Sequence, residues 1–356
     1  MITESIKIFV PGRLCLFGEH SDWAGLHRKI NANIVPGMAI VASIEQGIYA
    51  EVKRSDRFII HNESEELRDI WFDFDSTIQT KELRNIAVSN SYFSYVAGVA
   101  SYIKDHYNVS GLKITIKKMT LPIKKGLSSS AAICVLVTRA FNLLYQLNLN
   151  TIGEMNIAFK GERRTKSRCG RLDHACAFGG SPVCIHFDGD KIKVERLVSK
   201  EPLYLVFANL NAEKDTIRIL SDLNKCYPFA TNEKEKNVHE ALGTKNQEIV
   251  GLAIGYIKNG DVVSLGQLMT KAQKLFDVMI APASPEQLSA PKLHQFLNDK
   301  IVQSLSYGGK GVGSQGDGTI QFLAKNIVSQ KQLIVYLQQE GLIPYPLTIK
   351  PKHLPY

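Results

Sequence analysis

Residues 122–132, Pro-Ile-Lys-Lys-Gly-Leu-Ser-Ser-Ser-Ala-Ala, decide the fold of the first half of this chain. They follow an alternating segment, residues 112–117, that predicts a strand, and they open a helix predicted over residues 129–147. The first N–H groups of such a helix lack intrahelical partners, and the helix dipole adds partial positive charge there. The stretch therefore predicts a phosphate cradle. A serine-capped helix after an ordinary turn is the structural alternative.

Two other segments accompany this loop. Residues 11–25 read Pro-Gly-Arg-Leu-Cys-Leu-Phe-Gly-Glu-His-Ser-Asp-Trp-Ala-Gly, and residues 162–180 run from Glu162 through Asp173 to Gly180. In this order the three segments resemble the motifs of the GHMP small-molecule kinases. The first is similar to the galactokinase form Pro-Gly-Arg-x-x-x-x-Gly-Glu-His-x-Asp. The second resembles the phosphate loop of the family, and the third resembles the segment that carries its metal-binding Glu and catalytic Asp.

The resemblance implies a fold as well as a function. It implies an α+β, two-domain GHMP kinase fold with the active site in the interdomain cleft. We expect an N-terminal domain over residues 1–200, with the ATP loop and the catalytic residues, and a ferredoxin-like C-terminal domain over residues 201–356. The hydrophobic pattern itself predicts further helices over residues 91–107 and 152–166 and strands over residues 6–10 and 38–52.

The resemblance assigns the catalytic pair to Asp173 and Arg13. A sugar hydroxyl is weakly acidic, so its deprotonation benefits from a neighbouring carboxylate and a nearby positive charge. Arg13 would also keep Asp173 ionised, because an opposite charge lowers the pKa of a carboxyl group. Either residue alone would be an ordinary member of a surface ion pair.

The resemblance also implies ATP and Mg²⁺ as the nucleotide and the metal. The ATP phosphates would lie against six loop residues: Lys125, Gly126, Leu127, Ser128, Ser129 and Ser130. Mg²⁺ prefers hard oxygen ligands and keeps several waters, so Ser130 and Glu162 would suffice as its protein ligands. The alternative for Glu162 is a solvated helix charge beside Arg163 and Arg164.

The substrate side is assigned to Glu19, His20 and Asp22, together with Asp173. Carboxylates suit a polyol, because each accepts two hydroxyl protons in a fixed geometry. A turn-forming aspartate and a satisfied buried histidine are the structural alternatives. The resemblance thus predicts a kinase that phosphorylates a sugar or sugar derivative at the anomeric C1 hydroxyl.

Four departures from the galactokinase pattern leave the sugar open. Lys124 stands where the first loop glycine is expected, and His174 stands where Gln usually follows the catalytic Asp. Residues 26–37 form an apparent insertion, in which Arg28 suggests an anionic sugar; a solvated basic loop is the alternative. The glycine-rich segment 308–316 predicts a loop that packs near the site, or a flexible linker.

Composition limits the other function classes. The formal charge of +9 and pI near 9.1 permit nucleic-acid or membrane contact, but the basic residues are scattered and no reader motif appears. We therefore expect no nucleic-acid or membrane partner, and a monomer or small homo-oligomer that binds ATP and a sugar. Six cysteines without a Cys-x-x-Cys pair favour reduced thiols and a cytoplasmic location. A sugar-phosphate or non-sugar alcohol kinase on the same fold, and a catalytically silent sugar sensor, remain alternatives.

Overall fold

The computed structural model describes residues 5–65, 74–77, 79–89, 91, 93–121, 128–167, 169–212 and 214–351. The chain forms two compact units, each assembled from separate stretches of sequence. Unit 1 contains residues 1–13 and 43–179, and unit 2 contains residues 14–42 and 180–356. Residues 14–42 belong to the same compact unit as residues 180–356. The division into domains 1–200 and 201–356 therefore stays a prediction.

Unit 1 is built on a mixed sheet. Its strands lie in the order β4-β3-β5-β2, and β1 also pairs with β2. Strand β3 runs parallel to β5, whereas β2 runs antiparallel to it. The bounds are β1 (Ile6–Phe17), β2 (Gly37–Ser55), β3 (Phe58–Asn62), β4 (Phe74–Ser76) and β5 (Gly111–Met119), and both β1 and β2 continue into unit 2. The strands predicted at residues 6–10, 38–52 and 112–117 are present.

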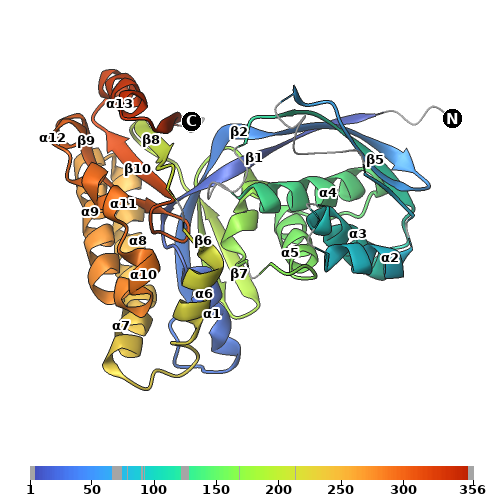
Figure 1. Ribbon diagram of the computed structural model, residues 1–356, viewed down its shortest axis with the longest axis horizontal. Coiled ribbons are helices and arrows are strands. Elements are labelled where there is room, and N and C mark those ends of the chain that lie inside the picture. The colour runs from blue at the N-terminus through green and yellow to red at the C-terminus, as the bar shows by residue number, and fades with distance from the viewer. Residues whose placement is uncertain are drawn as a thin grey trace. The chain divides into compact units, whose positions relative to one another are not determined.

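Helices of unit 1 pack against one face of this sheet (Figure 1). They are α2 (Thr80–Ala87), α3 (Ser94–His106), α4 (Ser129–Tyr145) and α5 (Thr151–Glu162), followed by the short 3-10 helix η3 (Leu172–Phe178). Helix α4 is apolar nearly all round, and its residues 131–138 are all buried. A helix that is apolar on nearly all sides must lie inside the unit. Its burial fixes the position of its N-terminal end, where Ser129 and Ser130 lie.

Unit 2 has its own antiparallel sheet, in the order β11-β8-β10-β9. The strands are β8 (Leu203–Asn209), β9 (Ser306–Val312), β10 (Thr319–Ala324) and β11 (Ile343–Ile349), and the hairpin of β6 (Val183–Asp188) and β7 (Lys191–Arg196) pairs with the start of β2. Apolar side chains from β8, β10, α11 and α13 form one core cluster. Sheets covered by helices in both units confirm the predicted α+β class.

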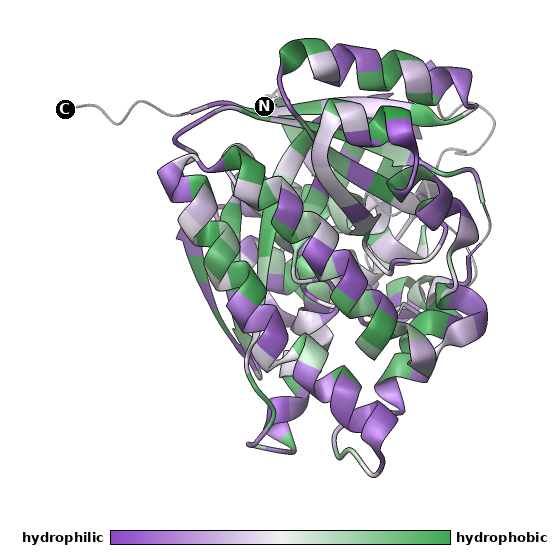
Figure 2. Cartoon of the chain, turned by 90° about the vertical axis from the view of Figure 1, so that its left-hand side faces the viewer, coloured by the Kyte–Doolittle hydropathy of each residue, from purple (hydrophilic) through white to green (hydrophobic). Residues whose placement is uncertain are grey.

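Several helices of unit 2 are amphipathic, and Figure 2 shows hydrophobic and hydrophilic residues alternating along them. Such stripes bury one side of each helix against the unit. Their bounds are α1 (Ser21–Leu26), η1 (His27–Lys29), α6 (Thr216–Asn224), α7 (Glu233–Leu242), α8 (Thr244–Asn259), α9 (Val262–Met279), η4 (Ala281–Ala283), α10 (Pro285–Leu288), α11 (Pro291–Leu297), α12 (Lys300–Leu305) and α13 (Ile327–Gln339).

The glycine-rich segment corrects one sequence prediction. Residues 308–312 are not a loop or linker but belong to β9, which pairs with β10. The glycines permit close packing, because a Cβ built on Gly308 would lie 2.0 Å from the carbonyl oxygen of Gly266 in α9. Glycine usually weakens a strand, but it is favoured where another backbone approaches closely.

This close approach predicts a large cost for one added methyl group. Gly308→Ala should destabilise the protein by roughly 1–3 kcal/mol, because the added carbon must displace backbone rather than a flexible side chain. Gly251→Ala in α8 is the matched control, since a Cβ there meets nothing within 4 Å. Urea denaturation should show the control to be neutral or slightly stabilised. Equal midpoints for the two variants would contradict this packing.

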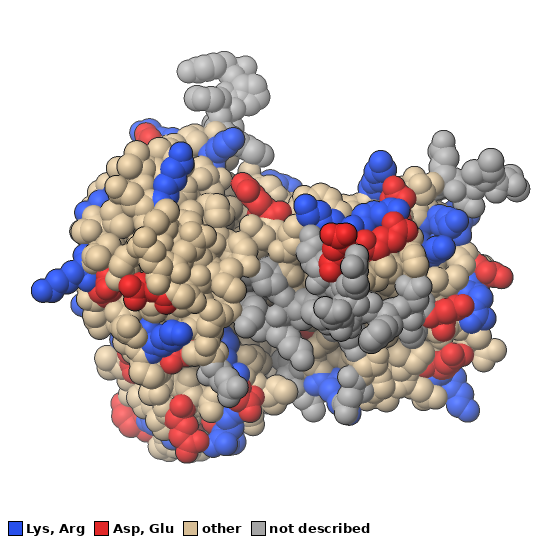
Figure 3. Space-filling model, turned by 45° about the horizontal axis from the view of Figure 1, so that its top comes forward, with Lys and Arg blue, Asp and Glu red and all other residues tan. Residues whose placement is uncertain are grey.

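None of the helices within the described ranges has the length and apolarity needed to cross a membrane. On the face that Figure 3 shows, lysine and arginine side chains are interspersed with aspartate and glutamate. Within the described residues, many lysines and arginines form ion pairs with acidic side chains, as Lys117 does with Glu51 and Glu63. The basic side chains visible on that face therefore form small groups among acidic ones.

Candidate active site

In unit 1, Asp173 lies at the start of η3 and is held by two partners. Its Oδ1 accepts a charge-assisted hydrogen bond from Arg13 Nη2 and a second bond from Ser128 Oγ, the latter at 2.9 Å. Arg13 is buried in β1, while the Asp173 side chain is 31% exposed. Burial alone would raise the pKa of the Asp173 carboxyl, but Arg13, His174 and Ser128 hold that pKa below its ordinary value. The carboxylate is thus ionised and accessible.

The serines of the predicted phosphate loop mark the start of α4. Ser128 is the N-cap in a left-handed conformation (φ 62°), and Ser129 and Ser130 begin the helix. A non-glycine residue in that conformation stores strain of the kind found at ligand sites. Lys125, Gly126 and Leu127 lie outside the described residues. The structure brings Ser128 to Asp173, an arrangement that the loop motif alone did not indicate.

Glu162, the predicted metal ligand, ends α5 inside unit 1. It is only 1% exposed, so the solvated-charge alternative is wrong. Its Oε1 accepts a hydrogen bond from Ser167 at 3.0 Å, and its Oε2 lies 2.9 Å from Nε2 of the fully buried His174. Glu162 therefore has one carboxylate oxygen, Oε1, that is hydrogen-bonded and one, Oε2, that faces His174.

In unit 2, the predicted substrate residue Glu19 forms a buried ion pair with Lys310 of β9. Lys310 is 2% exposed and also donates to the Gly311 carbonyl oxygen at 2.8 Å. The Gly311 N–H donates in turn to the Gln273 side chain of α9 at 2.7 Å. A cavity of about 40 Å³ is lined by Glu19 and Lys310 among others. The pair places a fixed carboxylate at this small cavity.

His20 is the N-cap of α1, and Asp22 lies in its first turn. His20 is buried with φ 69°, its Nδ1 accepts a hydrogen bond from Trp23 Nε1 at 3.0 Å, and its ring stacks on Phe276. Asp22 is buried in the same turn. These contacts fix the side chains, while their contact with a substrate stays a prediction. A second cavity of unit 2, about 510 Å³ beside α9, α11 and β9, is lined by neither residue.

In the insertion over residues 26–37, Arg28 and Lys29 bind acceptors that belong to unit 2. Arg28 Nε donates to Asp188 at 2.5 Å, and Arg28 Nη1 donates to the carbonyl oxygens of Ala32 and Ile34. Lys29 pairs with Asp190 at 2.6 Å. The guanidinium fork proposed for an anionic sugar is therefore occupied by protein acceptors, which favours the structural alternative for this loop.

Sequence reasoning assigned no role to Lys310, although a lysine inside a glycine-rich strand was the available signal. It also noted His174 only as a departure from the family pattern. Lys310 and Glu19 are separated by 291 positions, so nothing local in the sequence indicates their pairing. His174 lies only 12 positions from its neighbour Glu162, but the sequence does not show that the two side chains face each other.

Comparison with known proteins identifies chains similar to this one. Residues 94–180 match the model described as "GHMP kinases N terminal domain". A galactokinase of Thermotoga petrophila is 27% identical over 288 residues, covering 74% of this chain and 75% of that protein. A Lactococcus lactis galactokinase solved with galactose superimposes with a TM-score of 0.73 at 17% identity, over 98% of this chain and 94% of that one. An L. major mevalonate kinase solved with R-mevalonate gives 0.69 at 20% identity, over 99% of each chain.

Proposed function

Because the chain is a galactokinase-like member of the GHMP kinases, we propose that it transfers the γ-phosphate of ATP to a sugar or sugar derivative, at the anomeric C1 hydroxyl. The observation that carries this proposal is the arrangement around Asp173. Arg13 and Ser128 both bind Oδ1, and among the described residues Oδ2 accepts no hydrogen bond. A substrate hydroxyl would donate to Oδ2, so Asp173 would orient the nucleophile and take its proton.

The residues present fit a nucleotide and a magnesium ion. The N-terminus of the 17-residue helix α4 offers backbone N–H groups and partial positive charge to phosphates. Ser130 supplies a hydroxyl in its first turn, and Glu162 Oε2 is a buried carboxylate oxygen without a hydrogen-bond donor among the described residues. Bound Mg²⁺ would neutralise charge on the phosphoryl oxygens during transfer. Ser130 and Glu162 would hold it, and Arg13 would keep the base ionised.

An enzyme is favoured over a silent sensor because Asp173, Arg13 and the serines at the start of α4 are all present. On the substrate side, we propose that Glu19, His20 and Asp22 bind sugar hydroxyls, with the Glu19 carboxylate oriented by Lys310. The Glu19 carboxylate, held by Lys310, could accept hydroxyl protons but could not donate to a phosphate or carboxylate group. A neutral sugar therefore fits these residues better than an anionic one. We also place the protein in the cytoplasm, where its six free thiols would persist.

The substrate class is tested by measuring ADP release with neutral hexoses and pentoses, uronic acids, sugar phosphates, mevalonate and homoserine. We expect sugar-dependent ADP release, with neutral sugars turned over at the highest kcat/KM. Release only with mevalonate or homoserine would favour the non-sugar alternative on the same fold. ADP release that no acceptor stimulates would contradict the proposal.

The metal assignment predicts a changed magnesium requirement. Ser130→Ala and Glu162→Gln each remove one oxygen ligand, so the Mg²⁺ concentration for half-maximal rate should rise at least about tenfold. The measurement is initial rate against free Mg²⁺ at saturating ATP. An unchanged requirement in both variants would mean that the ion binds elsewhere.

A further inference from the structure

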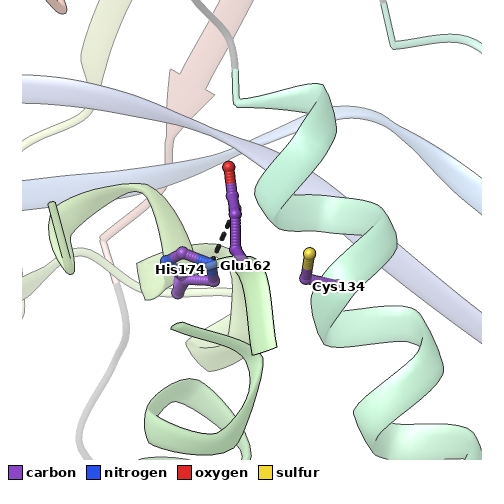
Figure 4. Close-up of side chains that lie close together, drawn as sticks. All are labelled: Cys134, Glu162 and His174. Atoms are coloured by element: carbon purple, nitrogen blue, oxygen red, sulfur yellow. Dashed lines mark ion pairs between the residues drawn. The ribbon is translucent and has the colours of Figure 1, made fainter. Parts of the chain in front are cut away.

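Three side chains that can ligate a metal converge in the interior of unit 1. Cys134 comes from α4, Glu162 from the end of α5 and His174 from η3 (Figure 4). One ligand atom of each lies within 4.8 Å of the other two. All three residues are buried, with exposures of 0–1%. Figure 4 shows Glu162 between the other two side chains.

Three polar atoms of this cluster lack the hydrogen bonds that burial ordinarily demands. Glu162 Oε2 and both ring nitrogens of His174 are buried without a hydrogen-bond partner among the described residues. The 2.9 Å separation of Oε2 and Nε2 does not meet hydrogen-bond geometry. The Cys134 sulfur makes a long contact of 3.9 Å to the Tyr95 carbonyl oxygen and also interacts with the Glu162 carboxylate. Each unsatisfied buried group costs stability, which a bound cation would recover.

The donor set selects the kind of ion. A thiolate and a carboxylate carry two negative charges and a neutral imidazole carries none, so a divalent cation would make the buried site neutral. Sulfur and imidazole ligands favour borderline ions such as Zn²⁺ and Co²⁺, whereas Mg²⁺ prefers oxygen and keeps its waters. Three protein ligands and one exchangeable position are a common arrangement for zinc.

We propose that Cys134, Glu162 and His174 form a binding site for Zn²⁺ or a similar borderline divalent ion. Zinc bond lengths of about 2.0–2.3 Å place tetrahedral ligand atoms roughly 3.3–3.7 Å apart. The three ligand atoms here lie within 4.8 Å of one another, and Glu162 Oε2 lies 2.9 Å from His174 Nε2. The site has a consequence that rests on the proposed function. Zn²⁺ bound here occupies Glu162, the carboxylate assigned to Mg²⁺, and therefore inhibits the kinase.

Binding is tested on the full chain with Co²⁺ as the optical probe. A thiolate ligand gives sulfur-to-cobalt charge-transfer absorption, and a tetrahedral site gives intense visible bands. We expect one Co²⁺ per chain with both features, displaced stoichiometrically by Zn²⁺ and not by Mg²⁺. Cys134→Ser should abolish the charge-transfer band and weaken Zn²⁺ binding by at least about 100-fold, since even the loss of a residue behind a ligand costs 10–100-fold.

Controls separate metal ligation from damage to the fold. Cys226→Ser changes another buried cysteine, in unit 2, and should leave the cobalt spectrum unchanged. His174→Gln should lose the visible bands, and its thermal melting without metal should show whether the chain is folded. If the charge-transfer band survives in Cys134→Ser, or if the wild type binds no stoichiometric Co²⁺, the site does not exist.

The inhibitory consequence has its own readout. Zn²⁺ should inhibit wild-type ADP release, whereas Cys134→Ser should keep its Mg²⁺-dependent rate and lose sensitivity to Zn²⁺. If the cobalt spectrum shows binding but Zn²⁺ does not inhibit ADP release, the two ions do not both bind Glu162. A wild type that phosphorylates no acceptor would overturn the proposed function, and the cobalt spectrum would still decide the metal site.

Discussion

Asp173→Asn should lower kcat by a factor of roughly 100–10,000 while ATP binding is retained. The amide has nearly the shape of the carboxylate but cannot accept the proton of a sugar hydroxyl. Arg13 would also lose the anionic partner of its charge-assisted hydrogen bond. Steady-state ADP release gives kcat, and fluorescence titration with a labelled nucleotide gives the affinity for ATP. The predicted pattern is a collapsed rate with little change in nucleotide affinity.

The matched control is Asp105→Asn in the same unit. Asp105 also pairs with arginines, Arg84 and Arg164, each at 2.6 Å, and its side chain is 19% exposed. It belongs to α3 and to no part of the proposed machinery, so kcat should remain within about twofold of wild type. If Asp173→Asn kept more than half of the wild-type kcat, Asp173 would not be the base.

Lys310→Met should destabilise the protein by roughly 3–5 kcal/mol, because it leaves the Glu19 charge buried without its partner. Both side chains are nearly inaccessible, at 2% and 5% exposure, so water cannot replace the lost ammonium group. The free energy of unfolding from urea titration measures this cost. The double variant Glu19→Met/Lys310→Met should recover most of it, since two apolar groups leave no unpaired charge.

Lys258→Met is the control for that substitution. Lys258 pairs with Glu195 at 2.8 Å on the surface of the same unit, where both side chains are about half exposed. Exposed pairs contribute less than about 1 kcal/mol. If Lys310→Met lowered the free energy of unfolding no more than Lys258→Met, the buried pair would not stabilise unit 2 more than an exposed pair does.

Local patterns predicted the elements that position the candidate site. The alternating residues 112–117 lie in β5, and the apolar run after Ser130 forms α4. These predictions succeeded because strand and helix periodicity are properties of contiguous sequence. The motif resemblance also placed Arg13 beside Asp173, 160 residues away, and the structure has them in contact.

The remainder depends on packing that a single sequence does not encode locally. Residues 308–312 read as a loop because glycine is rare in strands, but the close approach of α9 requires glycine there. The substrate prediction for Arg28 did not anticipate its partner Asp188, which lies in a distant strand. The cluster of Cys134, Glu162 and His174 joins three separate elements, so it became visible only in the folded chain.

Phosphorus NMR of the reaction mixture identifies the product that carries the transferred phosphate. Wild-type protein with galactose, ATP and Mg²⁺ should form a sugar phosphate whose signal couples to the anomeric proton, in amounts equal to the ADP formed. The Asp173→Asn variant should form none on the same timescale. ADP accompanied only by inorganic phosphate, or no phosphorylated product with galactose or any other sugar of the panel, would contradict the proposed sugar kinase.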